Sequence, residues 1–187
     1  MKALNRYFWP TKFKSRSEFL KQGVKCVFVS YQNADKQSAK KIADYLLSAG
    51  INVYFDEYDK DLKSSNQTKN PKRVTNALIK GINNSSHMLV LVSPSTLKSQ
   101  WVPFEIGYGN DKTNLNVLTL KGISKGKLPE YIRTAKIIRD IWDINSLISS
   151  LRGISKDTLI TLNTIKDDGD STNPLRFIMD PIVSENY

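Results

Sequence analysis

The sequence is nearly devoid of cysteine and histidine, with one of each, Cys26 and His87. A single cysteine cannot form an intramolecular disulfide, and the apolar run around Cys26 predicts a small buried side chain there. One cysteine and one histidine are too few for a Cys/His metal site, so no metal is expected. His87 precedes an apolar run and should lie where a strand begins, which leaves a Ser–His–Asp hydrolase without its base.

The sequence also lacks a long apolar segment. No stretch approaches the roughly 20 residues needed to span a bilayer, and the first ten residues, broken by Pro10, contain no signal-peptide core. We therefore expect a cytoplasmic protein with no membrane partner. The net charge of +10, from 28 Lys and Arg against 18 Asp and Glu, favours anionic partners such as nucleotides. Because the basic residues are scattered and not clustered with aromatic side chains, a nucleic-acid binder is disfavoured.

Short apolar segments alternate along the chain with segments of helical periodicity. Strands are expected at residues 24–31, 51–55, 88–92, 115–120 and 137–142. Helices are expected between the first two strands, up to the stop at Gly50, and at residues 71–82, 100–109, 129–133 and 144–151. This alternation predicts an α/β fold with a doubly wound parallel sheet of about five strands. Residues 159–162 are expected to add a strand or a helical turn.

Ligands of such sheets bind where the strands end. Three groups of residues fall at that edge: Ser30 with Tyr31, Asp56, and the segment from Ser99 to Ile106. In that segment Ser99 is a good helix N-cap, and Trp101 and Glu105, four residues apart, share a helix face. Val102 and Ile106 share another face and are expected in the core.

Several common chemistries are missing from this edge. No glycine loop follows the first strand, so the chain has neither a dinucleotide-binding fingerprint nor a P-loop. The third strand ends in Ser93-Pro94, where a response regulator needs an aspartate. What remains is a carboxylate beside aromatic side chains. A carboxylate can hold ribose hydroxyls or stabilise an oxocarbenium-like transition state, and aromatic rings offer stacking surfaces.

Five segments together resemble the TIR (Toll/interleukin-1 receptor) domain family over residues 23–151. They are Val27–Tyr31, Gly50–Asp56, residues 79–85, Ser93-Pro94-Ser95, and the Trp-x-x-x-Glu spacing of Trp101 and Glu105. The resemblance implies a flavodoxin-like, three-layer fold with strand order 2-1-3-4-5. Residues 1–22 and 152–187 are then N-terminal and C-terminal extensions.

The Trp-x-x-x-Glu spacing is that of catalytically active family members. It implies NAD+ glycohydrolase or cyclase activity, with NAD+ as substrate and not as a cofactor, and with Glu105 as the catalytic glutamate. Tyr31, Asp56 and Trp101 match positions that line the nucleotide pocket, and Ser30 joins these NAD-binding candidates although its hydroxyl is expected to bond backbone. Bacterial members act in anti-phage defence, and the chain is similar to the signal-generating TIR subunit of Thoeris systems, whose product acts on a separate effector.

The chain departs from receptor TIR domains in residues 56–70. This long polar loop lacks the Arg-Asp-x-x-Pro-Gly text of the receptors, and in the family the loop makes assembly contacts. The third family box is also absent, since Trp142 stands in a different context. A non-catalytic module acting through TIR–TIR self-association therefore stays open as the alternative, although the pair of Trp101 and Glu105 favours an enzyme.

Overall fold

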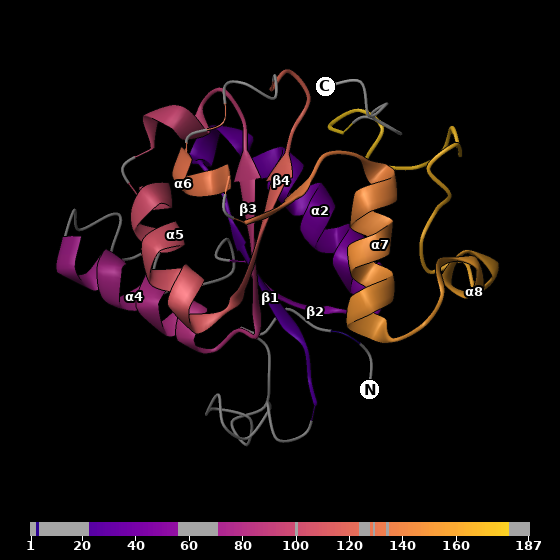
Figure 1. Cartoon of the computed structure of the whole chain (residues 1–187), viewed down its shortest axis with the longest axis horizontal. Helices are drawn as coiled ribbons and strands as arrows, with labels where there is room; N and C mark the ends of the chain where they lie inside the picture. The colour runs from indigo at the N-terminus through magenta and orange to yellow at the C-terminus, as the bar shows by residue number, and fades with distance from the viewer. Residues whose placement is uncertain are drawn as a thin grey trace.

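The computed structural model describes residues 3, 23–55, 71–99, 101–123, 128, 130–133 and 135–179. The expected loop at residues 56–70, with Asp56, and residues 4–22 lie outside the described residues. Within them the chain forms a sheet of five parallel strands (Figure 1). The strands are β1 (Cys26–Ser30), β2 (Asn52–Tyr54), β3 (His87–Val92), β4 (Asn114–Thr119) and β5 (Lys136–Ile138). Their order β2-β1-β3-β4-β5 confirms the predicted flavodoxin-like α/β fold.

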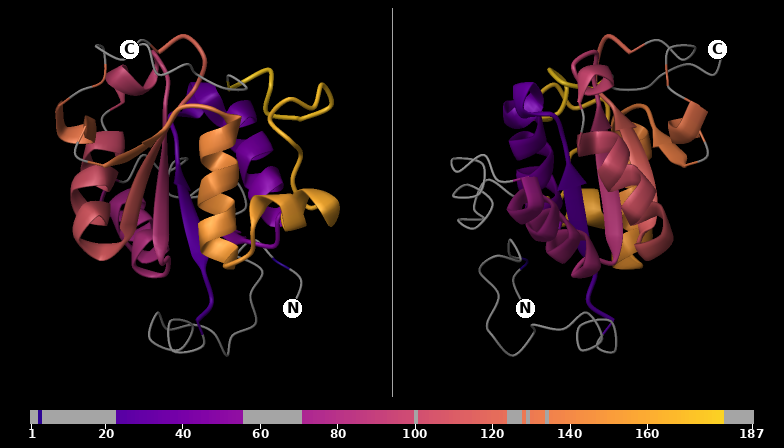
Figure 2. Two further views of the ribbon diagram at one scale, coloured as in Figure 1. Left: turned by 45° about the vertical axis from the view of Figure 1, so that its right-hand side comes forward. Right: turned by 90° about the vertical axis from the view of Figure 1, so that its left-hand side faces the viewer.

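Helices cover both faces of the sheet, which gives three layers (Figure 2). The helices are α2 (Lys36–Ser48), α4 (Pro71–Asn83), α5 (Trp101–Lys112), α6 (Glu130–Arg133), α7 (Ile141–Arg152) and α8 (Lys156–Thr161), with short 3-10 turns η3 (Asn33–Asp35) and η5 (Thr96–Lys98). Buried residues of α2, α7 and α8 form one core cluster with the sheet, and those of α4, α5 and α6 form the other.

The central strand β1 shows why the two faces are both apolar. All five of its residues are buried, and they alternate between the two clusters: Cys26 and Phe28 pack on the α4/α5 side, Val27 and Val29 on the α2/α7 side. A strand buried on both faces needs a continuous apolar run, which is what the sequence provides. The same alternation directs Ser30, at the end of β1, towards the α4/α5 side.

Helix α2 ends where a glycine is required. Gly50 has a φ of +81°, which only glycine adopts freely, and the guanidinium of Arg152 occupies the place where a Cβ atom would lie. That guanidinium donates a hydrogen bond to the carbonyl of Ala49. This hydrogen bond joins the C-terminal ends of α2 and α7, and it is possible because Gly50 has no side chain.

The last strand is shorter than predicted. The sequence pattern extended it over residues 137–142, but β5 ends at Ile138 and Trp142 belongs to α7. The reason is a helix cap: the carboxylate of Asp140 accepts a hydrogen bond of 2.8 Å from the backbone N–H of Asp143. The mixture of apolar and charged residues that suggested one edge strand thus contains the end of β5, the helix cap and the first residues of α7.

The segment that follows α7 packs on the α2/α7 side of the domain. Leu159, in α8, and Ile165, Leu175 and Met179 are buried in that core cluster. The hydroxyl of Tyr45 in α2 anchors the segment, because it accepts a hydrogen bond of 3.0 Å from the backbone N–H of Lys166. The apolar residues near the chain's end therefore contribute to the core. The assignment of residues 152–187 as an extension to the family domain stays a prediction.

Candidate functional site

The candidate site lies where β1 and β3, neighbours in the sheet, reach their carboxyl ends. Ser30 is the last residue of β1 and is 2 % exposed. Strand β3 ends at Val92, and the chain then passes through η5 to the start of α5. Because α5 packs on the side to which Ser30 points, the first turns of α5 lie over this serine.

Helix α5 begins as the sequence predicts. The Ser99 hydroxyl accepts hydrogen bonds from the backbone N–H groups of Trp101 (3.3 Å) and Val102 (3.2 Å), which caps the helix start. Pro103 occupies the first turn, where its missing N–H costs nothing. Val102 and Ile106 are buried in the α4/α5 cluster, which confirms their predicted place in the core.

Glu105 is brought against Ser30. Its side chain is almost fully buried, at 6 % exposure, and its Oε2 accepts a hydrogen bond from the Ser30 hydroxyl. The expectation that this hydroxyl bonds backbone is therefore wrong. A buried carboxylate needs such charge-assisted hydrogen bonds to offset its lost hydration. Two of the predicted site residues, 75 positions apart in sequence, thus form one contact.

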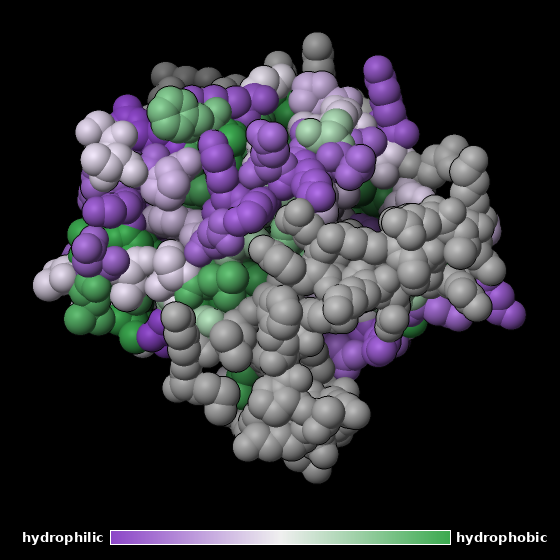
Figure 3. Space-filling view, turned by 180° about the vertical axis from the view of Figure 1, so that it is seen from behind, coloured by the Kyte–Doolittle hydropathy of each residue, from purple (hydrophilic) through white to green (hydrophobic). Residues whose placement is uncertain are grey.

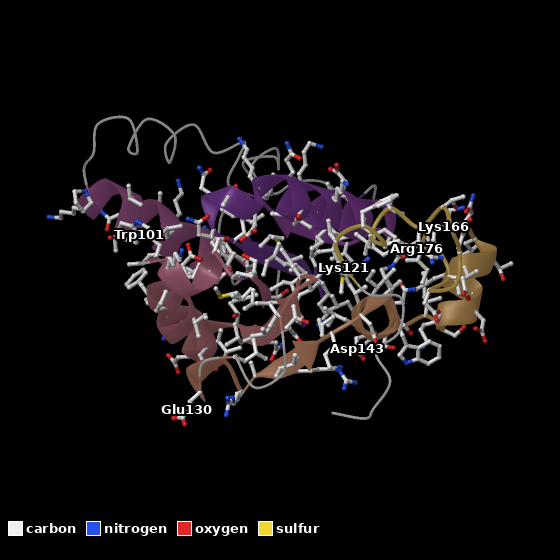
Figure 4. The ribbon with its side chains drawn as sticks, turned by 90° about the horizontal axis from the view of Figure 1, so that it is seen from above. Trp101, Lys121, Glu130, Asp143, Lys166 and Arg176 are labelled. Atoms are coloured by element: carbon white, nitrogen blue, oxygen red, sulfur yellow. The ribbon has the colours of Figure 1, made fainter. Side chains whose placement is uncertain are left out.

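Trp101 is the first residue of the same helix and lies at the surface. It is 38 % exposed, and its ring packs edge-on against Phe104, with 6.3 Å between ring centroids. Phe104 stacks in turn on Tyr108, whose hydroxyl donates a hydrogen bond to Asn83 in α4. Trp101 therefore begins a row of aromatic rings along α5. Viewed from above, it stands at the opposite side of the molecule from Lys166 and Arg176 (Figure 4).

Tyr31 packs on the other face of the sheet. One residue beyond Ser30, it is half-buried against the α2/α7 cluster, and its ring lies 5.3 Å from that of Phe55, centroid to centroid. Alternation along β1 explains the separation, since neighbouring residues of a strand point to opposite faces. Asp56 lies outside the described residues. The roles assigned to Ser30, Tyr31, Asp56, Trp101 and Glu105 stay predictions.

A second polar contact at this edge was not predicted. The carboxylate of Asp35, before α2, accepts hydrogen bonds from the hydroxyls of Ser93 (2.5 Å) and Ser95 (2.8 Å), after β3. The sequence held a signal for it. Polar residues follow both strands, and the strand order places the two loops side by side.

His87 lies at the opposite, amino-terminal edge of the sheet, as predicted, since it begins β3. Burial, assisted by the charge of Lys25, lowers the pKa of His87 to about 4, so the imidazole is neutral at pH 7. Its Nδ1 lies 2.8 Å from the Ser86 hydroxyl. The residue therefore belongs to the packing of the amino-terminal edge and lies far from Glu105.

Within the described residues, no group of three or more His, Cys, Asp or Glu side chains is placed to hold a metal ion. The same part of the chain contains no helix with the length and apolar character of a membrane span. In the face shown in Figure 3, hydrophilic and hydrophobic residues are interspersed over the described surface.

Comparison with known proteins agrees with this architecture. The family model described as "TIR domain" matches residues 27–143, more than half of the chain. The chain is similar in structure to the crystallised TIR domain of the Toll-related receptor TRR-2 from Hydra magnipapillata, with a TM-score of 0.52 and 18 % identity. That match covers 67 % of this chain and 97 % of the other, and at this identity it shows the fold alone. No curated protein matches the sequence. The match to the family model over most of the three-layer domain shows that the chain belongs to the TIR domain family.

Proposed function

We propose that this TIR domain cleaves the bond between nicotinamide and ribose in NAD+, with Glu105 as the catalytic carboxylate. TIR domains are signalling modules that act on NAD+ or assemble through TIR–TIR contacts. The observation that carries the enzymatic proposal is the buried Glu105, which meets Ser30 at the carboxyl edge of the sheet. Carboxylates held away from water at such an edge are more typical of ligand sites than of packing.

To cleave this bond, the protein mainly needs to orient the substrate and to stabilise positive charge on the ribose. In hydrolysis the bond from ribose C1′ to the nicotinamide nitrogen breaks, and its electron pair stays on the ring, whose positive charge it neutralises. Water adds to C1′ and releases a proton. An oxocarbenium-like transition state forms on the ribose, and a nearby carboxylate stabilises it. If an atom of the substrate itself replaces water as the nucleophile, the product is a cyclic or variant ADP-ribose.

The other candidates are proposed as contacts to the substrate or as supports of the carboxylate. Glu105 would accept hydrogen bonds from ribose hydroxyls, with Ser30 holding the carboxylate in place. Trp101, exposed at the start of α5, offers a flat surface for the nicotinamide or adenine ring. Tyr31 and Asp56 are proposed as further contacts to the nucleotide. The resemblance further suggests anti-phage defence in a bacterial cytoplasm, self-association, and a separate effector that responds to the product.

A non-catalytic assembly module is the second candidate, because the contact between Ser30 and Glu105 would also serve to dock α5 on the sheet. Nicotinamide release from NAD+, measured over a range of protein concentrations and with a cellular trigger, separates the two. We expect Glu105→Ala to lower the rate by about 100-fold or more. Glu130→Ala is the matched control, since Glu130 is exposed on α6.

Each outcome has a clear consequence. If the concentrated or triggered wild-type protein releases no nicotinamide, the assembly module is the better assignment. If wild type is active and Glu105→Ala matches it, the catalytic residue lies elsewhere. Chromatography of the products then distinguishes linear ADP-ribose from a cyclic or variant form.

A further inference from the structure

The side chain of Asp35 forms hydrogen bonds outside its own helix. Asp35 is the last residue of η3, directly before α2, and its side chain makes no hydrogen bond to the start of α2. Its Oδ2 accepts hydrogen bonds from the hydroxyls of Ser93 and Ser95 instead, 58 and 60 residues away in the sequence. The carboxylate therefore joins the loop after β1 to the loop after β3.

Hydrogen bonds continue from that loop to the start of α5. The backbone N–H of Ser93 donates to the hydroxyl of Thr96 (2.9 Å), which itself donates to the carbonyl of Leu91 (3.1 Å). The N–H of Ser99 donates to the carbonyl of Thr96 (3.0 Å). Ser99 then caps the helix by accepting from the N–H of Trp101. The connection is unbroken from the Asp35 carboxylate to the residue that begins α5.

We infer that Asp35 is a positioning residue, which fixes the loop after β3 and thereby the placement of Trp101. Glu105 is held separately, by Ser30 and by the burial of its neighbour Ile106. Removal of the Asp35 carboxylate should therefore loosen the Trp101 end of α5 more than the Glu105 end. The structural part of this inference needs no enzymatic activity; only its kinetic consequence rests on the proposed function.

Tryptophan fluorescence tests the structural part. The chain has three tryptophans, so replacing Trp9 and Trp142 with Phe leaves Trp101 as the reporter. In that background Asp35→Ala should raise the acrylamide quenching of Trp101 about twofold at a temperature well below unfolding. Asp35→Asn, which keeps a carbonyl oxygen for the two hydroxyls, should restore most of the protection. Asp44→Ala is the matched control, because Asp44 lies in α2 and forms an exposed ion pair with Lys40.

The kinetic part uses NAD+ in the otherwise unaltered chain. Asp35→Ala should raise KM about tenfold and leave kcat within about threefold, since the binding surface moves while Glu105 stays in place. Ser95→Ala, a milder change at a half-buried position, should raise KM in the same direction.

The two measurements fail independently. If the quenching of Trp101 in Asp35→Ala equals that in Asp44→Ala, the positioning role is refuted, whatever the activity. If quenching rises but kcat falls with KM unchanged, Asp35 acts on the chemical step and the inference is again wrong. If wild type cleaves no NAD+, the proposed function fails, and the quenching result alone decides the role of Asp35.

Discussion

The hydroxyl of Tyr45 should contribute a large part of the domain's free energy of unfolding. Its hydroxyl donates to Oδ1 of Asn145 at 2.9 Å and accepts from the backbone N–H of Lys166 at 3.0 Å. Tyr45 is 4 % exposed and Asn145 is 1 % exposed. Tyr45→Phe keeps the ring and removes the hydroxyl, so both partner groups lose a hydrogen bond in a poorly hydrated place. Each such loss costs about 1–3 kcal/mol, and we expect a total of about 2–3 kcal/mol.

Chemical denaturation and thermal melting measure this loss. For a chain of this size, about 2–3 kcal/mol corresponds to a fall in Tm of about 5–10 °C. Tyr108→Phe is the matched control: Tyr108 is half-buried and donates one hydrogen bond, to Asn83, so we expect less than about 1 kcal/mol. Equal losses in the two variants would refute the reasoning. So would a separate, earlier transition of the segment after α7 in wild type, since that segment would then not share the core.

The same hydroxyl predicts a dependence on alkaline pH. Burial raises the pKa of Tyr45 above its ordinary value, so the folded protein holds this proton at pH values where the unfolded chain has lost it. The contribution is fully present below pH 10 and is lost as the pH rises through the folded pKa. Wild type should therefore lose stability above about pH 10 more steeply than Tyr45→Phe, because the variant has no phenol at this position.

Two further predictions concern His87 and the glycines that end helices. The pKa of His87, lowered to about 4 by burial, means that the unfolded chain binds a proton that the folded one does not, so stability should fall as the pH drops from about 6.5 to 4. Between pH 6.5 and pH 4, His87→Gln should lose about 1–2 kcal/mol less free energy of unfolding than wild type, as measured by chemical denaturation at each pH. The same pH dependence of stability in both proteins would contradict the lowered pKa. Gly50→Ala should cost about 2 kcal/mol, because the positive φ strains the new side chain and the Arg152 guanidinium must move away from the Ala49 carbonyl to which it donates a hydrogen bond. Gly153→Ala, at a φ of +64° in open space, should cost about 1 kcal/mol, and an equal loss at both positions would show that the Arg152 contact is unimportant.

Most of the fold could be predicted because its signals are local. The run of buried residues in β1, Pro71 at the first position of α4, and the Ser99 cap of α5 each act on their immediate neighbours. The exception is instructive. Asp140 caps α7 through one side-chain hydrogen bond, so residues 141 and 142 are helical where a strand was predicted, and a hydrophobic pattern does not register such a bond.

The site was harder to predict because it depends on which side chains meet. Sequence analysis predicted that Ser30 and Glu105 lie at one edge of the sheet, but it did not predict their contact. It also grouped Tyr31 with them, although the alternation of side chains along a strand directs Tyr31 to the other face of the sheet. The bonds of Asp35 join residues about 60 positions apart and follow from strand order. These features depend on tertiary contacts, which the spacing of residues along the chain does not predict.

Because Glu105 is buried, one substitution at this position can be measured for both stability and activity. A carboxylate at 6 % exposure has lost most of its hydration, and the Ser30 hydroxyl offsets part of that cost. Glu105→Gln keeps the size and an oxygen that can accept from Ser30, while it removes the buried charge. With either role the variant should be at least as stable as wild type, because it removes the buried charge and keeps the acceptor for Ser30. If the residue only docks α5, an active protein should release nicotinamide at the same rate after the substitution. If the charge of Glu105 stabilises the transition state, Glu105→Gln should lose nearly all activity without losing stability, because catalytic sites retain groups that are costly to the fold.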